Sequence, residues 1–211
     1  MIVKYSKPKY WDKAVKHLST VDPVLSNVIS KYKAHNFLTI TNTPFKTLFK
    51  IILGQQISIE AANSIETRIK KNIKQITPKK FLTEDINKLR SYGLSYRKIK
   101  YISGIAETIQ SKPKFFKNIS LLNDHDAIKE LTGLYGLGPW SAEMFLIFQY
   151  NRQNILPLGD IGLINSFCDN YKIKKELFSS EILKYKEIWN PYCTVATWYL
   201  WRDIDEDVVQ Y

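Results

Sequence analysis

Apolar residues recur with helical spacing along almost the whole chain of 211 residues. Phe45, Leu48 and Phe49 are followed by Ile52 and Leu53, which is the i, i+3, i+4, i+7, i+8 pattern of a buried helix face. The same periodicity marks further segments, among them residues 11–18, 23–29, 61–69, 99–109, 161–171, 180–189 and 192–201. Only residues 36–42 fit an extended segment. The pattern therefore predicts an all-α protein.

Residues that favour helix ends divide this pattern into separate helices. Asp22 precedes Pro23, and a capping carboxylate followed by proline is typical of a helix start. Ser95 is expected to cap the helix that runs toward residue 109. Thr83 is expected to start a short helix that Gly93 ends in the left-handed conformation.

A glycine-rich turn separates two of the predicted helices, in the sequence Leu131-Thr-Gly-Leu-Tyr-Gly-Leu-Gly-Pro-Trp140. Glycines let the backbone approach a ligand closely, and N–H groups at a helix N-terminus attract phosphate. The alternative is an ordinary pair of antiparallel helices, which needs one glycine rather than three. The spacing favours a helix-hairpin-helix motif that contacts the DNA backbone.

A lone carboxylate, Asp160, follows in the sequence Leu156-Pro-Leu-Gly-Asp160. An aspartate in such a loop commonly caps a helix, here the one predicted over 161–171. A carboxylate beside a helix N-terminus is electrostatically favourable and can stabilise a cationic transition state. Spacing alone leaves both roles open for Asp160.

The chain is strongly basic, with 31 Lys and Arg against 20 Asp and Glu and a formal net charge of +11. An excess of this size favours a polyanionic partner, because binding releases counterions and steers association. The pair Lys70 and Lys71 and the cluster Arg97, Lys98 and Lys100 are candidates for steering phosphate. A solvated helix face explains each group equally well.

The two cysteines, Cys168 and Cys193, are too few for an iron–sulfur cluster or a four-cysteine zinc site. We expect both to be small buried hydrophobic residues. The N-terminus lacks the apolar core of a signal peptide, and no apolar run is long enough to span a membrane. These features predict an intracellular protein of the cytoplasm or nucleoid (the nucleus in a eukaryote), with no membrane partner.

Several motifs together resemble the helix-hairpin-helix/Gly-Pro-Asp superfamily of base-excision DNA glycosylases. The resemblance runs from about Phe45 to Trp201. Within the superfamily, the chain looks like the DNA-3-methyladenine glycosylase II branch. The resemblance rests on four separated places, which are Ile52–Ser58, Tyr92–Lys98 with Tyr101 and Ile102, the hairpin with Asp160, and Trp189–Tyr192 with Ala196–Trp201.

The resemblance implies roles for two residues in catalysis. Asp160 matches the catalytic aspartate, which assists departure of the base and attack by water on the sugar. Trp140 stands where relatives with lyase activity carry a lysine nucleophile. A tryptophan cannot form a Schiff base, so we expect a monofunctional enzyme that leaves an abasic site.

The resemblance also implies a base pocket and a wedge. Trp140 and Trp201 match positions that line the pocket, where aromatic faces attract electron-poor alkylated purines. Met144 and Ile161 stand where tyrosines occur in the best-known bacterial pattern, so the pocket is expected to be less aromatic. Gln56 matches the residue that fills the gap left by the flipped nucleotide, while Gln55 is expected to join neighbouring loops by hydrogen bonds.

The hairpin is expected to hold the DNA backbone. The amides of its glycines and of the following helix would donate to phosphate; these residues are Gly136, Gly138, Trp140 and Ser141. In the family a monovalent cation (Na⁺ or K⁺) often lies on hairpin carbonyls, which match those of Thr132, Leu134 and Leu137. No redox cofactor and no iron–sulfur cluster is expected. The carbonyl ligands leave no side-chain signature in the sequence.

The expected architecture is a two-lobed helical bundle with a DNA cleft between the lobes. Residues 1–43 with 123–211 are assigned to one lobe and residues 44–122 to the other. The predicted function is hydrolytic release of alkylated purines, such as 3-methyladenine and 7-methylguanine, from double-stranded DNA by a monomer. The alternatives are a glycosylase for hypoxanthine or uracil and a helix-hairpin-helix module that only binds DNA.

Overall fold

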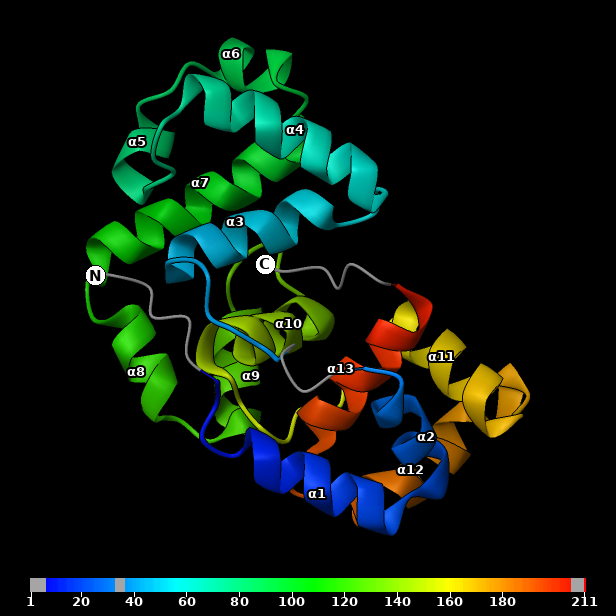
Figure 1. Ribbon diagram of the computed structural model, residues 1–211. Coiled ribbons are helices and arrows are strands. Elements are labelled where there is room, and N and C mark those ends of the chain that lie inside the picture. The colour runs from blue at the N-terminus through cyan, green and yellow to red at the C-terminus, as the bar shows by residue number, and fades with distance from the viewer. Residues whose placement is uncertain (1–6, 33–36, 206–210) are drawn as a thin grey trace. The chain divides into compact units, whose positions relative to one another are not determined.

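The computed structural model describes residues 7–32, 37–205 and 211, and within them all regular secondary structure is helical (Figure 1). The all-α prediction is confirmed for this part of the chain. Residues 37–42, which fit an extended segment, contain no strand, and Asn36 lies outside the described residues. No described helix is both long and apolar enough to cross a membrane.

The described residues form two compact units. The terminal unit comprises the described parts of residues 1–41 and 146–210, and the middle unit comprises residues 42–145 with Tyr211. The helices of the terminal unit are α1 (Trp11–Val21), α2 (Pro23–Ser30), α11 (Ile161–Tyr171), the 3₁₀ turn η1 (Lys175–Leu177), α12 (Phe178–Trp189) and α13 (Cys193–Ile204). Those of the middle unit are α3 (Pro44–Gly54), α4 (Ile59–Asn72), α5 (Pro78–Leu82), α6 (Ile86–Ser91), α7 (Tyr96–Ser111), α8 (Phe115–Leu121) and α9 (Asp124–Thr132).

The boundary between the units falls inside α10 (Pro139–Tyr150), after Phe145. The sequence-based division differs here, because it assigned residues 123–145 to the terminal lobe. In the structure α9, the hairpin and the start of α10 group with the middle unit. Side-chain contacts from α3 and α7 to the hairpin, described below, supply the physical reason.

The middle unit is built on the apolar face of α3. Phe45 and Phe49 both contact the ring of Phe81 edge-on, with centroids 6.5 and 6.1 Å apart, and all three side chains are buried. Helix α7 packs against α3 and α5, as Figure 1 shows. Ser95 caps α7 as predicted, because its hydroxyl accepts from the amide of Lys98. The cap of α6 is Asp85 rather than Thr83, since the helix begins two residues later than expected.

The terminal unit surrounds a buried carboxylate. Asp22 caps α2, as predicted, by accepting from the amide of Leu25. Its other oxygen accepts from the hydroxyl of Tyr171 and from the indole Nε1 of Trp189 at 2.8 Å. Burial and this hydrogen bond raise the pKa of Tyr171. Three donors thus satisfy a carboxylate that would otherwise be costly to bury, and they join α2, α11 and α12.

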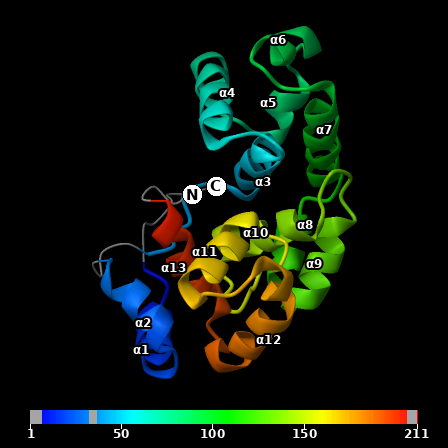
Figure 2. The same cartoon turned by 90° about the vertical axis from the view of Figure 1, so that its right-hand side faces the viewer.

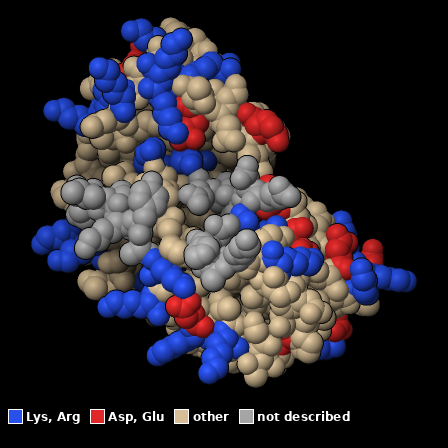
Figure 3. All heavy atoms as spheres, in the orientation of Figure 1, with Lys and Arg blue, Asp and Glu red and all other residues tan. Residues whose placement is uncertain are grey.

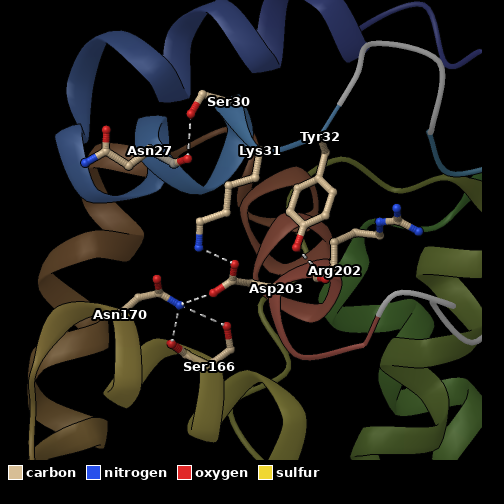
Figure 4. A network of polar contacts seen from close by, with 8 residues as sticks. All are labelled: Asn27, Ser30, Lys31, Tyr32, Ser166, Asn170, Arg202 and Asp203. Atoms are coloured by element: carbon tan, nitrogen blue, oxygen red, sulfur yellow. Dashed lines mark hydrogen bonds and ion pairs between the residues drawn. The ribbon is translucent and has the colours of Figure 1, made fainter.

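Helix α13 packs along α11 in the same unit (Figure 2). Asp203 on α13 accepts from Asn170 on α11 at 2.8 Å and from Lys31, the residue that follows α2, at 2.6 Å (Figure 4). Burial alone would raise the pKa of Asp203, but the donated hydrogen bonds from these two side chains lower it overall. The charge is therefore retained in a half-buried place, and it holds three helices together.

Candidate nucleic-acid interface and catalytic carboxylate

The hairpin between α9 and α10 is closed by short backbone hydrogen bonds. Leu134 donates to the carbonyl of Leu131 and Leu137 to that of Leu134, both at 3.0 Å. Gly136 lies between them with a φ of 95°, a conformation that L-amino acids rarely adopt. The tight turn confirms a helix-hairpin-helix, and it explains why this glycine is needed.

The ring of Tyr101 lies directly against Gly136. A Cβ placed on Gly136 would be 2.2 Å from Cγ of Tyr101, so no side chain fits. Tyr101 also meets the exposed Tyr135 edge-on, with centroids 5.0 Å apart. Tyr101 of α7 therefore packs directly against the backbone of the hairpin.

Gln55 joins α3 to the hairpin, as the sequence predicted. Its Nε2 donates to the carbonyl of Gly136 and to the hydroxyl of Ser141, both at 3.0 Å. Ser141 is buried, so its side chain faces the protein. Because the hairpin is tied to α3 and α7, it belongs to the middle unit.

Gln56 is exposed and has a backbone φ of 59°. A left-handed conformation costs a non-glycine residue free energy, and such strain is often retained at functional positions. Arg97 of α7 donates from Nη2 to the Oε1 of Gln56 at 3.0 Å. The side chain assigned as the wedge is thus exposed and oriented by a basic residue.

The start of α10 presents backbone amides. The first backbone hydrogen bond of this helix joins the amide of Ala142 to the carbonyl of Gly138 at 3.1 Å. The amides of Trp140 and Ser141 come before that bond, in the N-terminal turn of the helix. A Cβ on Gly138 would have no atom within 4 Å, so the fold itself does not require this glycine. Open space beside helix N-terminal amides is the geometry that accepts a phosphate.

Basic side chains of α7 contact residues next to this interface. Lys98 donates from Nζ to the carbonyl of Leu53 at 2.6 Å, and Lys100 lies 5.3 Å from the ring centroid of Tyr135. Burial, together with the charge of Arg97, lowers the pKa of Lys98. Arg97 holds Gln56, so all three members of the predicted cluster have a specific contact. Lys70, by contrast, is paired with Glu66 at 2.8 Å.

Further Lys and Arg residues are concentrated on the middle unit. Figure 3 shows them gathered over α4, α5 and α6. They occupy the last turns of these helices, where a positive charge is favourable; the residues are Lys71, Lys79, Lys80, Lys88 and Arg90. This unit therefore has the charge that a polyanion needs.

Asp160 caps α11 in the terminal unit. Its Oδ1 accepts from the amide of Leu163 at 2.7 Å and from the indole Nε1 of Trp201 at 2.8 Å. The loop before it is closed by the amide of Asp160 itself, which donates to Pro157. The carboxylate is half-buried, and its charge lies at a helix N-terminus. The capping role is confirmed, and it orients the carboxylate.

The structure brings some of the predicted pocket residues together. Ile161 follows Asp160 directly and is 72% exposed, while Trp201 contacts the carboxylate. In the middle unit Trp140 is half-buried and Met144 is only 2% exposed. The hydrogen bond from Trp201 was missed by the sequence reasoning, which assigned that residue to the pocket wall alone. No sequence pattern signals a bond between residues this far apart.

The cysteines are buried and free, as expected. Burial raises the pKa of Cys193 to about 12, which keeps the thiol protonated. Within the described residues no group of three or more His, Cys, Asp or Glu side chains could hold a metal ion. In the hairpin, the carbonyl of Leu134 already accepts from Leu137, which uses one of its two lone pairs.

Comparison with known proteins agrees with this geometry. Residues 49–191 match the HhH-GPD superfamily of base excision DNA repair proteins. DNA-3-methyladenine glycosylase 1 of Schizosaccharomyces pombe is 32% identical over 197 residues, covering 90% of this chain and 86% of the relative. The structure of the Schizosaccharomyces pombe 3-methyladenine DNA glycosylase Mag1 in complex with abasic DNA has a TM-score of 0.76 and 30% identity, covering 90% of this chain and 95% of that one.

A more distant structure shares the fold alone. The 8-oxoguanine glycosylase/lyase of Clostridium acetobutylicum has a TM-score of 0.74 at 18% identity, covering 96% of this chain and 72% of that one. The chain therefore belongs to the HhH-GPD superfamily of base excision DNA repair proteins. The matched residues include the hairpin and Asp160.

Proposed function

We propose that this protein is a monofunctional DNA glycosylase that removes alkylated purines from double-stranded DNA and leaves an abasic site. The observation that carries the proposal is Asp160, a half-buried carboxylate held by two donors at the start of α11. It lies in a chain that is 32% identical to a DNA-3-methyladenine glycosylase.

In the proposed reaction, Asp160 supplies negative charge to the sugar as the base departs. Cleavage of the N-glycosidic bond leaves positive charge on the sugar, and a fixed carboxylate stabilises it without having to reorganise. The same carboxylate can orient the water that attacks C1′, with the proton passing to solvent. An alkylated purine carries ring charge or leaves readily, so little assistance to the leaving group is required.

In the same proposal, the hairpin binds the DNA backbone and Gln56 enters the duplex. The amides of Gly136, Gly138, Trp140 and Ser141 would donate to phosphate, which fixes the register without reading sequence. Gln56 can both fill the gap and hydrogen-bond the orphaned base. We also propose a monovalent cation on the carbonyls of Thr132, Leu134 and Leu137, and no other cofactor.

The absence of lyase chemistry is part of the proposal and rests on Trp140. A lyase needs an amine that forms a Schiff base with C1′, and an indole cannot do this. Trp140, Trp201, Met144 and Ile161 are proposed to bound the base pocket, where aromatic faces favour electron-poor purines. We propose that the protein acts as a monomer in the compartment that holds chromosomal DNA.

Free-base analysis tests the proposal. The protein is incubated with methylated duplex DNA and with duplexes that contain hypoxanthine or uracil, and released bases are identified by mass spectrometry. Release of 3-methyladenine or 7-methylguanine is expected. Release of hypoxanthine or uracil alone would show that alkylated purines are not the substrate class. DNA binding without release of any base would show that the protein is a DNA-binding module and not a glycosylase. A covalent adduct trapped by borohydride would contradict the monofunctional mechanism.

A further inference from the structure

Trp201 makes two contacts that together fix the direction of its indole N–H. Its ring is stacked on Phe148 of α10, with centroids 5.9 Å apart and planes inclined by 10°. Its Nε1 donates to the Oδ1 of Asp160 at 2.8 Å. Stacking holds the plane of the indole, so the N–H points at the carboxylate rather than turning with the side chain.

The hydrogen bond from Trp201 restricts the orientation of the Asp160 carboxylate more than the capping bond alone would. The amide of Leu163 also binds Oδ1, at 2.7 Å. The terminal torsion of an aspartate is broad, so a single hydrogen bond leaves the carboxylate room to turn. Two donors from different helices on one oxygen set the carboxylate plane and therefore the direction of Oδ2.

Gly162 provides the space for this contact. A Cβ on Gly162 would lie 3.1 Å from Oδ1 of Asp160 and 3.3 Å from Cδ1 of Trp201. Both distances are shorter than ordinary van der Waals contact, so a side chain would push the pair apart. The backbone of Gly162 is not in the left-handed region. Its lack of a side chain is explained by the Trp201–Asp160 contact and not by its conformation.

The helix that carries Trp201 is tied to α11 at a second point. Asn170, near the end of α11, donates to Asp203, two residues after Trp201, and Lys31 binds the other oxygen of Asp203 (Figure 4). This network opposes sliding of α13 along α11. The donor from Trp201 is therefore presented by a helix of set register.

We propose that Trp201 is a positioning residue that acts through Asp160, and that Gly162 is the glycine that permits it. The inference rests on the proposed function, in which Asp160 is catalytic. If Trp201 were only a pocket wall, its ring would suffice and its N–H would be dispensable. If it positions Asp160, removing the N–H alone slows the chemical step and leaves DNA binding unchanged.

The decisive variant replaces Trp201 in the full chain by β-(3-benzothienyl)alanine, which exchanges the indole N–H for sulfur and keeps the ring. Base release from methylated duplex is measured under single turnover, and affinity is measured on a duplex with a tetrahydrofuran abasic site. A fall in rate of roughly ten- to a hundredfold at unchanged affinity is expected. The matched control is the same exchange at Trp189, whose N–H binds the buried Asp22. It should lower stability and leave the rate unchanged.

Gly162→Ala tests the steric half of the proposal. Alanine favours a helix over glycine, which offsets the cost of displacing the Trp201–Asp160 pair, so stability should change little while the rate falls. Gly104→Ala in α7 is the control, because a Cβ there has no atom within 4 Å. It should match or exceed wild-type stability with an unaltered rate. Equal rates for Gly162→Ala and wild type would contradict the spacing role.

A spectroscopic measurement keeps the two proposals distinct. In a ¹⁵N-labelled protein the indole proton resonance of Trp201 should move upfield in Asp160→Asn, because a neutral acceptor makes a weaker hydrogen bond. The Trp189 resonance should stay in place. A wild-type protein that releases no base overturns the proposed function. An active wild type whose benzothienyl variant is equally fast, or whose Trp201 resonance is unmoved, overturns the positioning role alone.

Discussion

The ring of Tyr101 occupies the space that a side chain on Gly136 would need. A Cβ at residue 136 would lie 2.2 Å from the ring, and the backbone φ there is 95°. The aromatic ring supports the turn, while the glycine lets the turn approach the ring. Helix α7 and the hairpin are thus complementary although Tyr101 and Gly136 lie 35 positions apart in the sequence (136 − 101).

Substitutions at two hairpin glycines are expected to have different effects. Gly136→Ala should lower the free energy of unfolding by about 2–4 kcal/mol, through backbone strain and overpacking. Gly138→Ala should leave stability nearly unchanged, because a Cβ at Gly138 has open space, but should weaken binding to abasic DNA by obstructing a phosphate. Urea denaturation and fluorescence anisotropy measure the two effects. A Gly138→Ala protein with wild-type affinity would exclude this glycine from the interface.

Asp160→Asn should reduce base release by at least about a hundredfold, since it removes the charge proposed to stabilise the sugar cation. Asparagine is also a good N-cap, so stability and DNA affinity should persist. Asp160→Ala is the matched comparison, and it should lose activity and about 1 kcal/mol of stability together. Single-turnover release from methylated duplex gives the rates. Substantial turnover by Asp160→Asn would remove this residue from the mechanism.

The neighbours Gln55 and Gln56 should respond in opposite ways. Gln55→Leu removes donors to Gly136 and Ser141 and should cost roughly 1–3 kcal/mol of stability. Gln56→Gly relieves a left-handed φ and should not lower stability, yet it should slow base excision by removing the proposed wedge. Thermal unfolding and single-turnover rates measure the two effects. If both variants changed stability alone, the wedge assignment would be wrong.

Stability should decline in alkali partly through Cys193. Burial raises the pKa of its thiol from the ordinary 9.0 to about 12. The unfolded chain therefore loses this proton first, so the contribution is complete below about pH 9 and is lost as pH rises toward 12. The slope from this one group is at most about 1.4 kcal/mol per pH unit. Burial likewise raises the pKa of Tyr150 to about 12, so some alkaline loss remains in any thiol variant.

Urea unfolding of wild type and Cys193→Ser at pH 8 and pH 10.5 measures this contribution. Serine does not ionise in this range, so the variant should lose less stability between the two values, at an unchanged dependence on urea. Identical losses in both proteins would show that the thiol does not titrate with unfolding.

Local sequence was sufficient to predict a feature where the interaction that determines it lies within one turn of a helix. Asp22 and Ser95 were predicted to be caps, and capping was one of two roles considered for Asp160, because a capping side chain bonds an amide three residues ahead. The prediction that Thr83 caps α6 was wrong, because Asp85, two residues later, is an equally good capping residue and the local sequence does not choose between them. Four separated motifs in the right order, the hairpin with Asp160 among them, sufficed to indicate the family.

Tertiary structure decided the contacts between elements that are distant in sequence. Trp201 was assigned to a pocket wall, and only the packing of α13 on α11 shows that its N–H binds Asp160. The hairpin groups with α3 and α7 because Gln55 and Tyr101 reach it. Periodicity tells which face of a helix is buried, but the partner of that face depends on packing, which no spacing along the chain encodes.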